Sequence, residues 1–165
     1  MDNNILTGII IDKAIKIHQK LGPGLFESIY EEVIDYELKK EGLKCLRQVV
    51  LPVKYDDLIL KAGYRIDLLI EDKIIVELKS IETVKSIHKK QLLTYLKLSS
   101  LKVGLLINFN VVLLKHGIIR ISNWLYFSFS SSVHSVRDLF GLVCMYYFYG
   151  TLYFLTGFTE GRESS

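Results

Sequence analysis

The sequence predicts an α/β layer domain over residues 1–121, in which helices precede and follow a mixed β-sheet. Residues 9–21 and 26–41 each have apolar side chains at the spacing of an amphipathic helix. Two β-rich runs, 64–70 and 74–80, flank a charged tripeptide, which predicts a tight hairpin. Each of these elements must bury an apolar face against another, so we expect packed layers of helix and sheet.

Glycine and proline mark the ends of the predicted N-terminal helices. The first helix is broken by Gly22, Pro23 and Gly24, and the second ends at Gly42. The remaining predicted elements are strands at 44–55 and 58–61, a helix at 87–98, a buried strand at 103–109, and a last hairpin of strands at 111–114 and 118–121.

Composition narrows the class of protein. The chain has 165 residues, half of them apolar, which is enough for one domain with a hydrophobic core. A net charge of +3 permits nucleic-acid binding without arguing for it. Cys45 and Cys144 lie far apart without CxxC spacing, so we predict no zinc site or disulfide framework and expect a reducing cytoplasm. The N-terminus lacks the basic region of a signal peptide.

Residues 122–165 differ in composition from the predicted domain, and we interpret them as a separate aromatic and hydrophobic extension. Residues 139–159 carry no charge, and a segment of this length could span a bilayer. Its tyrosine, glycine and threonine residues make it a poor membrane span. We favour an extra element packed on the domain, or an irregular extension without function, over a membrane anchor.

The predicted hairpin carries charged side chains on one face. With three loop residues, Asp67 lies opposite Glu77. Because side chains alternate along a strand, one face is expected to hold Arg65, Asp67, Glu77 and Lys79. The other face is expected to hold Ile66, Leu68, Ile70, Ile74, Val76 and Leu78. Charged residues on a strand face usually form a solvated surface with cross-strand ion pairs, and this interpretation remains open.

The same charged residues suit a divalent-metal site. Mg²⁺ prefers one or two carboxylates together with waters and substrate phosphate. Asp67 and Glu77 would hold the ion, and Lys79 would reach the same water because it lies two residues from Glu77 on the same strand face. Partial burial beside a metal can lower the pKa of a lysine toward the range of a general base.

Glu27, Gln91 and Tyr95 are further candidates outside the hairpin. Glu27 begins the second predicted helix, where the helix dipole favours a carboxylate, and it is also a candidate metal ligand, direct or through water. Gln91 and Tyr95 lie four residues apart on the third helix and so share one face. They are either ordinary surface residues or a pair that binds phosphate.

A basic patch accompanies this pair on the third helix. It consists of Lys85, Lys89 and Lys90, with His88 one turn before Gln91. Most such runs are only solvated helix faces. Contacts to nucleic-acid phosphates nevertheless need charges of this kind, so these four residues are candidate nucleic-acid contacts.

Several motifs, in the right order, resemble those of the GxxExxY proteins, small bacterial proteins grouped with the PD-(D/E)XK nuclease superfamily. The signature itself reads Gly24-Leu-Phe-Glu27-Ser-Ile-Tyr30. The similarity covers about residues 5–121 and includes residues 18–31, Gln48, Asp67 with Glu77-Leu78-Lys79, residues 88–97 and residues 104–109. Ile66 stands where the superfamily pattern has proline, a residue that is often absent.

The resemblance implies a restriction-endonuclease-like fold, a three-layer core with a central mixed β-sheet flanked by helices. It implies that Asp67 and Glu77 are the metal-binding acids, with the Leu78 carbonyl as a further ligand. Lys79 would position or help to deprotonate the attacking water and stabilise developing charge. The implied cofactor is Mg²⁺ or Mn²⁺.

The resemblance also assigns roles to the helical residues. Glu27 would be the helix acid of the superfamily, and Gln91 with Tyr95 matches the Q-x-x-x-Y motif of its exonuclease-like branches. The implied function is a metal-dependent nuclease that hydrolyses phosphodiester bonds, with DNA favoured over RNA and a homodimer as a further hypothesis. The alternative is a non-catalytic nucleic-acid-binding or interaction module that keeps the fold.

Overall fold

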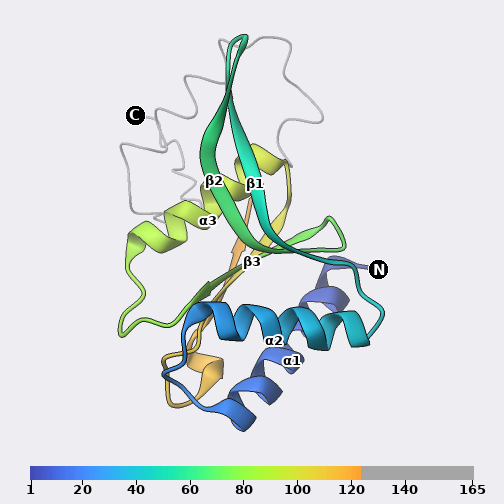
Figure 1. The fold of residues 1–165 in the computed structure, drawn as a ribbon, viewed down its shortest axis with the longest axis vertical. Coiled ribbons are helices and arrows are strands. Elements are labelled where there is room, and N and C mark those ends of the chain that lie inside the picture. The colour runs from blue at the N-terminus through green and yellow to red at the C-terminus, as the bar shows by residue number, and fades with distance from the viewer. Residues whose placement is uncertain (124–165) are drawn as a thin grey trace, which may run out of the picture. The chain divides into compact units, whose positions relative to one another are not determined.

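The computed structural model describes residues 1–123, and Figure 1 shows how their elements are arranged. Within these residues the elements follow in the order α1 (Asn3–Leu21), α2 (Glu27–Lys40), β1 (Cys45–Tyr55), β2 (Leu58–Ile70), β3 (Ile74–Lys79), α3 (Ser86–Ser99), β4 (Val103–Asn108), the 3₁₀ helix η1 (Leu114–His116) and β5 (Ile118–Ser122). The three predicted helices are therefore present. Helix α1 begins earlier than expected because the Asp2 carboxylate caps it, accepting a hydrogen bond from the Asn4 N–H at 2.8 Å.

The strands form one mixed sheet in the order β1-β2-β3-β4-β5. β3 and β4 are parallel and α3 connects them, whereas the other neighbouring strands are antiparallel. All six residues of β4 are buried, as the continuous apolar run predicted. The register of the β2–β3 hairpin, with Ile70 opposite Ile74 and Leu68 opposite Val76, also agrees with the three-residue turn expected from the sequence.

Apolar clusters fill both faces of this sheet. On one face α1 and α2 pack against side chains of the central strands such as Leu68, Val76 and Leu105. On the other face Leu92 and Leu96 of α3 pack against the sheet. Helices thus cover both faces (Figure 1), and the predicted α/β fold class, a three-layer core with a central mixed β-sheet flanked by helices, is confirmed.

β2 is one long strand rather than the two short strands, 58–61 and 64–70, that the sequence predicted. It pairs with β1 along most of its length, with a register shift between Leu51 and Val53. Gly63 allows this close pairing, because a Cβ atom there would lie 2.9 Å from the Leu51 carbonyl oxygen. The two strands form a ribbon that projects from the rest of the described residues (Figure 1).

The predicted strand at 111–114 was wrong. This segment is irregular and leads into η1, and β5 pairs directly with β4 rather than with residues 111–114. Gly117 allows the chain to turn back toward β4. Its carbonyl accepts a hydrogen bond from the Asn108 N–H at 2.9 Å, and a Cβ atom at this position would clash with the Asn108 carbonyl. The buried Leu114 side chain holds η1 against the core.

The prediction that Ile66 shares a face with Leu68 was also wrong. Leu68 packs in the cluster beneath α1 and α2, whereas Ile66 packs in the cluster beneath α3. The change of face occurs at Asp67. There the β1–β2 ladder omits the pair of Gln48 and Asp67, and Gln48 has a φ of 53°. An irregularity of this kind turns the strand, so strict alternation fails across it.

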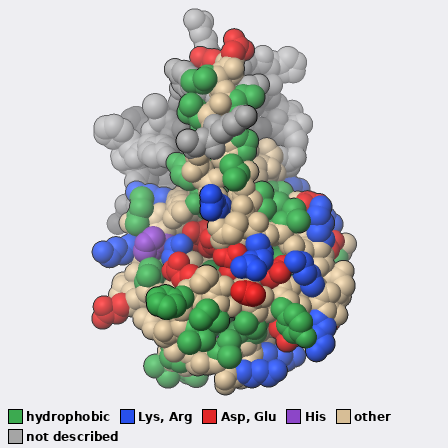
Figure 2. Space-filling view, viewed as in Figure 1, with side chains coloured by type: hydrophobic (Ala, Val, Ile, Leu, Met, Phe, Trp, Pro, Cys, Tyr) green, Lys and Arg blue, Asp and Glu red, His purple; other side chains and the backbone are tan. Residues whose placement is uncertain are grey.

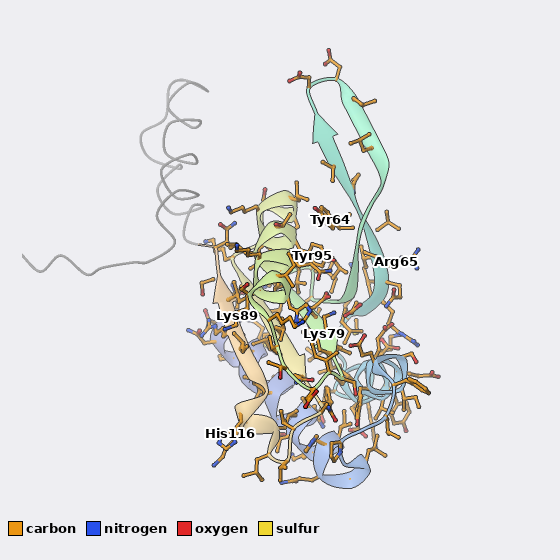
Figure 3. All side chains as sticks on the ribbon, turned by 90° about the vertical axis from the view of Figure 1, so that its left-hand side faces the viewer. Tyr64, Arg65, Lys79, Lys89, Tyr95 and His116 are labelled. Carbon is orange, nitrogen blue, oxygen red and sulfur yellow. The ribbon has the colours of Figure 1, made fainter. Side chains whose placement is uncertain are left out.

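Arg65 consequently does not share the face of the acids. The Tyr64 ring contacts the Tyr95 ring of α3, with centroids 5.3 Å apart. Arg65 is exposed and points away from these two rings (Figure 3). The predicted charged group therefore reduces to Asp67, Glu77 and Lys79, and the β2–β3 ladder ends before the expected pair of Asp67 and Glu77.

Among residues 1–123, no helix is both long enough and apolar enough to cross a membrane. The uncharged segment 139–159 lies outside the described residues. The division into a domain over 1–121 and an extension over 122–165 stays a prediction.

Candidate active site

Asp67 lies where β2 and β3 separate. Their ladder ends at Leu68 and Val76. Beyond it, the Asp67 Oδ2 atom accepts a hydrogen bond from the Leu78 N–H at 2.9 Å. A side-chain carboxylate thus replaces a backbone carbonyl as the partner of β3. This bond fixes Asp67 beside the segment that carries Glu77 and Lys79.

Glu77 is a buried carboxylate with one unpartnered oxygen. Its residue is 2 % exposed, and its Oε1 atom accepts a hydrogen bond from the Lys79 ammonium at 2.6 Å. Its Oε2 atom is buried and has no hydrogen-bond partner among the described residues. Burial, followed by the charge of Asp67, raises the pKa of Glu77 to about 7. A buried oxygen without a donor is costly and calls for a bound cation or a proton.

The pKa values of Asp67 and Lys79 are also raised. Burial is the main cause for Asp67, and the Leu78 N–H and the Lys79 charge oppose it. For Lys79, burial lowers the pKa, but the hydrogen bond and charge of Glu77 together with the charge of Asp67 outweigh it. The sequence suggested a lysine with a lowered pKa. Without a metal the opposite holds, because the neighbouring carboxylates stabilise the ammonium.

The acids fit a hard divalent cation. No group of three or more His, Cys, Asp or Glu side chains with metal-site geometry occurs among the described residues. Two carboxylates with one unpartnered buried oxygen nevertheless match Mg²⁺, which takes its other ligands from water and phosphate. The N–H and C=O of a strand residue point to the same side, so we expect the Leu78 carbonyl to face Asp67, as its N–H does.

Glu27 anchors the chain immediately after Lys79. As the first residue of α2, it accepts a hydrogen bond from the Ser80 N–H at 2.9 Å, and the Ser80 hydroxyl donates to the Leu25 carbonyl at 2.7 Å. Its charge contributes to raising the pKa of Asp67, Glu77 and Lys79. Glu27 therefore lies in the electrostatic environment of the acids, and its hydrogen bond is to the backbone of Ser80.

The turn before α2 is built by a glycine and a tyrosine. Gly24 has a φ of 96°, a conformation that strongly favours glycine. The Tyr30 hydroxyl donates to the Gly22 carbonyl at 2.7 Å and accepts from the Leu25 N–H at 3.3 Å. The spacing Gly24, Glu27, Tyr30 thus corresponds to one local structure that presents Glu27 at the end of β3.

Gln91 and Tyr95 are joined, as their spacing predicted. The Gln91 amide donates to the Tyr95 hydroxyl. Tyr95 is not a surface residue, since it is 2 % exposed. Burial, opposed by the Gln91 hydrogen bond, raises its pKa, with further contributions from Glu77 and Asp67. Helix α3 therefore places this pair beside the acids, with Tyr64 covering Tyr95 (Figure 3).

The basic residues of α3 lie near its N-terminal end. Lys85, Lys89 and Lys90 are exposed. The His88 Nδ1 atom accepts a hydrogen bond from the Lys85 N–H at 3.1 Å, so this ring caps the helix. On the face shown in Figure 2, acidic and basic side chains lie next to one another below the β1–β2 ribbon. Lys79 is the lysine whose charge acts on the pKa of both Asp67 and Glu77.

Three polar residues near the acids escaped prediction as site residues. Glu31, 6 % exposed, accepts hydrogen bonds from the Arg47 Nε atom at 2.8 Å and from the Gln48 amide at 2.6 Å. The same Gln48 amide lies 3.5 Å from the Asp67 Oδ1 atom. Two sequence signals were available: the four-residue spacing of Glu27 and Glu31, which places both carboxylates on one face of α2, and the family resemblance, which included Gln48 without giving it a role.

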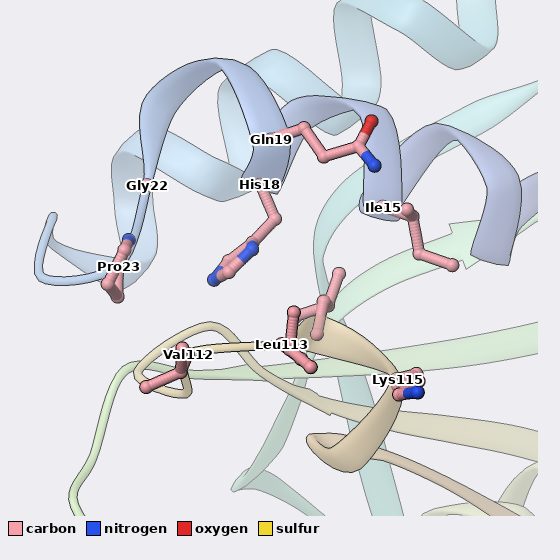
Figure 4. Close-up of a pocket in the computed structure, with 9 residues that line it drawn as sticks. Ile15, His18, Gln19, Gly22, Pro23, Val112, Leu113 and Lys115 are labelled. Atoms are coloured by element: carbon pink, nitrogen blue, oxygen red, sulfur yellow. The ribbon is translucent and has the colours of Figure 1, made fainter.

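Two pockets lie near these elements. One, of about 360 Å³, borders the acid site and is lined by Gly24, Leu25, Phe26, Glu27, Ser80 and Asn110. The other, of about 430 Å³, lies between the end of α1 and the loop before β5 (Figure 4) and is lined by Ile15, His18, Gln19, Gly22, Pro23, Val112, Leu113, Leu114 and Lys115. Asp67 and Glu77 line neither of these two pockets, and the first reaches the site only through Glu27 and Ser80.

Comparison with known families gives a match over most of the described residues. A family model described as the PD-(D/E)XK nuclease superfamily matches residues 4–121. The match contains Asp67, Glu77 and Lys79 as well as Glu27 and the Gln91–Tyr95 pair. No curated protein and no solved structure matches the chain.

Proposed function

The chain belongs to the PD-(D/E)XK nuclease superfamily, and on this basis we propose that it is a metal-dependent nuclease that hydrolyses the phosphodiester bonds of DNA. We place it in the GxxExxY branch, because the Gly24, Glu27 and Tyr30 side chains and backbone form one structural unit at the site. The family match gives the superfamily, whereas the DNA substrate and the GxxExxY branch are our proposals.

One observation carries the proposal most strongly, the unpartnered buried oxygen of Glu77 beside Asp67. Asp67, Glu77 and the Leu78 carbonyl would hold Mg²⁺ or Mn²⁺. When bound, the ion supplies positive charge to the phosphate and lowers the pKa of a coordinated water. A cation would also relieve the repulsion between the two carboxylates, which burial makes costly.

Lys79 would serve as a cationic hydrogen-bond donor. Its raised pKa keeps it protonated at neutral pH, and its ammonium already contacts Glu77 at 2.6 Å. From this position it would orient the attacking water and stabilise negative charge that develops on the phosphate oxygens. A proton-accepting role would first require the metal to neutralise the two carboxylates.

The remaining residues would bind the nucleic acid. Lys85, Lys89 and Lys90 are exposed and would contact phosphates on either side of the cleaved bond. Gln91 and the buried Tyr95 would shape the floor of the site. A duplex presents two strands, so a homodimer with one site per strand is part of the proposal.

Cleavage assays with purified full-length protein test the proposal. We expect Mg²⁺- or Mn²⁺-dependent cleavage of single- or double-stranded DNA, tested alongside RNA. Asp67→Asn should reduce the rate by more than about 100-fold, a loss typical when catalytic groups are removed. Asp72→Asn is the matched control, since Asp72 pairs only with Lys44 among the described residues, on the exposed turn of the same hairpin.

Two results would contradict the proposal. Cleavage by Asp67→Asn at the wild-type rate would exclude the assigned site. DNA binding by the wild type without cleavage, and without metal binding, would instead favour a non-catalytic nucleic-acid-binding module that keeps the fold.

A further inference from the structure

Gln48 has an unusual backbone conformation at the edge of the acid site. Its φ of 53° lies in the left-handed region, which residues other than glycine rarely adopt. On either side of it Arg47 pairs with Leu68 and Val49 pairs with Ile66, so the irregularity is confined to one position. A strained residue inside a strand persists only where the surrounding structure holds it, and such positions cluster at functional sites.

The Gln48 side chain contacts two carboxylates. Its Nε2 atom donates to the Glu31 Oε2 atom at 2.6 Å and lies 3.5 Å from the Asp67 Oδ1 atom. One amide NH₂ group has two N–H bonds and can serve two acceptors at once. The Leu78 N–H already occupies Asp67 Oδ2. The amide therefore acts on the Asp67 oxygen that β3 leaves free for a metal.

Glu31 determines which way this amide faces. The carboxylate is 6 % exposed, and the Arg47 Nε atom holds its second oxygen at 2.8 Å. Because an ionised carboxylate only accepts hydrogen bonds, it binds the nitrogen of the Gln48 amide and excludes the flipped orientation. Helix α2 thus supports the site at two points, since Glu27 on the preceding turn holds Ser80 after β3.

We propose that Gln48 is a positioning residue that orients the Asp67 carboxylate for metal binding, and that Glu31 orients the Gln48 amide. This inference rests on the proposed metal site but not on the identity of the substrate. Residues that hold a metal ligand in place typically change metal affinity or activity by about 10–100-fold when they are removed. The same loss is expected here.

Calorimetric titration of the full-length protein with Mn²⁺ alone tests the inference. Gln48→Gly removes the amide but accepts the positive φ, so the backbone is kept. We expect this variant to bind Mn²⁺ about 10–100-fold more weakly while it still unfolds cooperatively in urea, because relief of the positive φ offsets part of the cost of removing the donor to Glu31. Glu31→Ala should weaken binding in the same direction. Asp56→Gly is the matched control, because Asp56 has a φ of 50° at the tip of the ribbon, and its Mn²⁺ affinity should equal that of the wild type.

The outcomes separate this inference from the proposed function. Wild-type Mn²⁺ affinity in Gln48→Gly, together with loss of binding in Asp67→Asn, would overturn the positioning role and leave the metal site intact. Wild-type affinity in Glu31→Ala would overturn the role of Glu31. No Mn²⁺ binding by the wild type would overturn both the inference and the proposed function.

Discussion

The buried Glu77 carboxylate should make the stability of the metal-free protein depend on pH. Its pKa is raised from 4.5 to about 7, so the folded state retains a proton that the unfolded state has already lost. The stability that this proton provides is present below pH 4.5 and disappears as the pH rises through about 7. The shift of the Glu77 pKa from 4.5 to about 7 corresponds to at most about 3 kcal/mol of unfolding free energy, at 1.36 kcal/mol per pH unit.

Glu77→Gln removes the titrating group and should flatten this dependence. Urea unfolding of the metal-free protein, measured from pH 4.5 to pH 8, gives the free energy of unfolding of the wild type and of the variant. We expect the wild type to lose up to about 3 kcal/mol relative to Glu77→Gln over this range. The readout is how the free energy of unfolding changes with pH in each protein, not its absolute value, because Glu77→Gln also changes the contact with Lys79 and so shifts the stability at every pH.

A matched variant and a metal titration complete this experiment. Glu82→Gln changes an exposed glutamate and should keep the wild-type profile. Saturating Mg²⁺ at pH 8 should restore stability to the wild type but not to Glu77→Gln, because the ion binds the ionised site of the folded state. Parallel profiles for the wild type and Glu77→Gln between pH 4.5 and pH 8 would refute the reasoning.

Further predictions concern individual contacts. Lys79→Met should abolish cleavage while retaining Mn²⁺ affinity, measured by calorimetry, since the ammonium repels a cation; loss of binding would show that Lys79 builds the site instead. Tyr30→Phe removes a hydroxyl that bonds Gly22 and Leu25 and should lower the free energy of urea unfolding by about 1–2 kcal/mol, with no change counting against its role. Gly117→Ala should destabilise by about 1–3 kcal/mol, because its Cβ clashes with the Asn108 carbonyl; a neutral result would mean that the loop yields. Lys89→Ala should remove about one phosphate contact and so reduce the slope of log DNA affinity against log salt concentration by about one. An unchanged slope in a fluorescence titration would place Lys89 outside the interface.

Local patterns were sufficient for the centre of the site. A three-residue turn sets the register of the β2–β3 hairpin up to Leu68 and Val76, so the sequence could predict that Asp67 lies near Glu77 but not that the ladder ends before this pair. The i,i+4 spacing likewise predicted the contact between Gln91 and Tyr95. These relations depend only on the geometry of one strand pair or one helix.

Other features depend on contacts between distant segments. Gln48 bonds Glu31 at the residue where β1 is irregular, and neither composition nor periodicity shows this irregularity. The same irregularity moves Ile66 to the opposite face of the sheet from Leu68, which strict alternation could not predict. The position of Tyr95 on a helix left open that it is an ordinary surface residue, whereas its burial depends on packing against the sheet.

The loop before β5 shows tertiary structure overriding a local pattern. Its apolar residues suggested a strand at 111–114, but a backbone hydrogen bond between Asn108 and Gly117 brings the chain back along β4. The irregular segment is held from outside by His18 of α1, whose ring nitrogen lies 2.9 Å from the Val111 carbonyl. Such a long-range contact has no signal in the local sequence.

The central claim is that the carboxylates of Asp67 and Glu77 bind a divalent metal. Diffraction from crystals grown with Mn²⁺, recorded at a wavelength where manganese scatters anomalously, tests it most directly. We predict an anomalous peak coordinated by Asp67 Oδ1 and Glu77 Oε2, which disappears in Asp67→Asn crystals grown in the same way. No peak between these carboxylates at saturating Mn²⁺, or a peak that persists in Asp67→Asn, would contradict the claim.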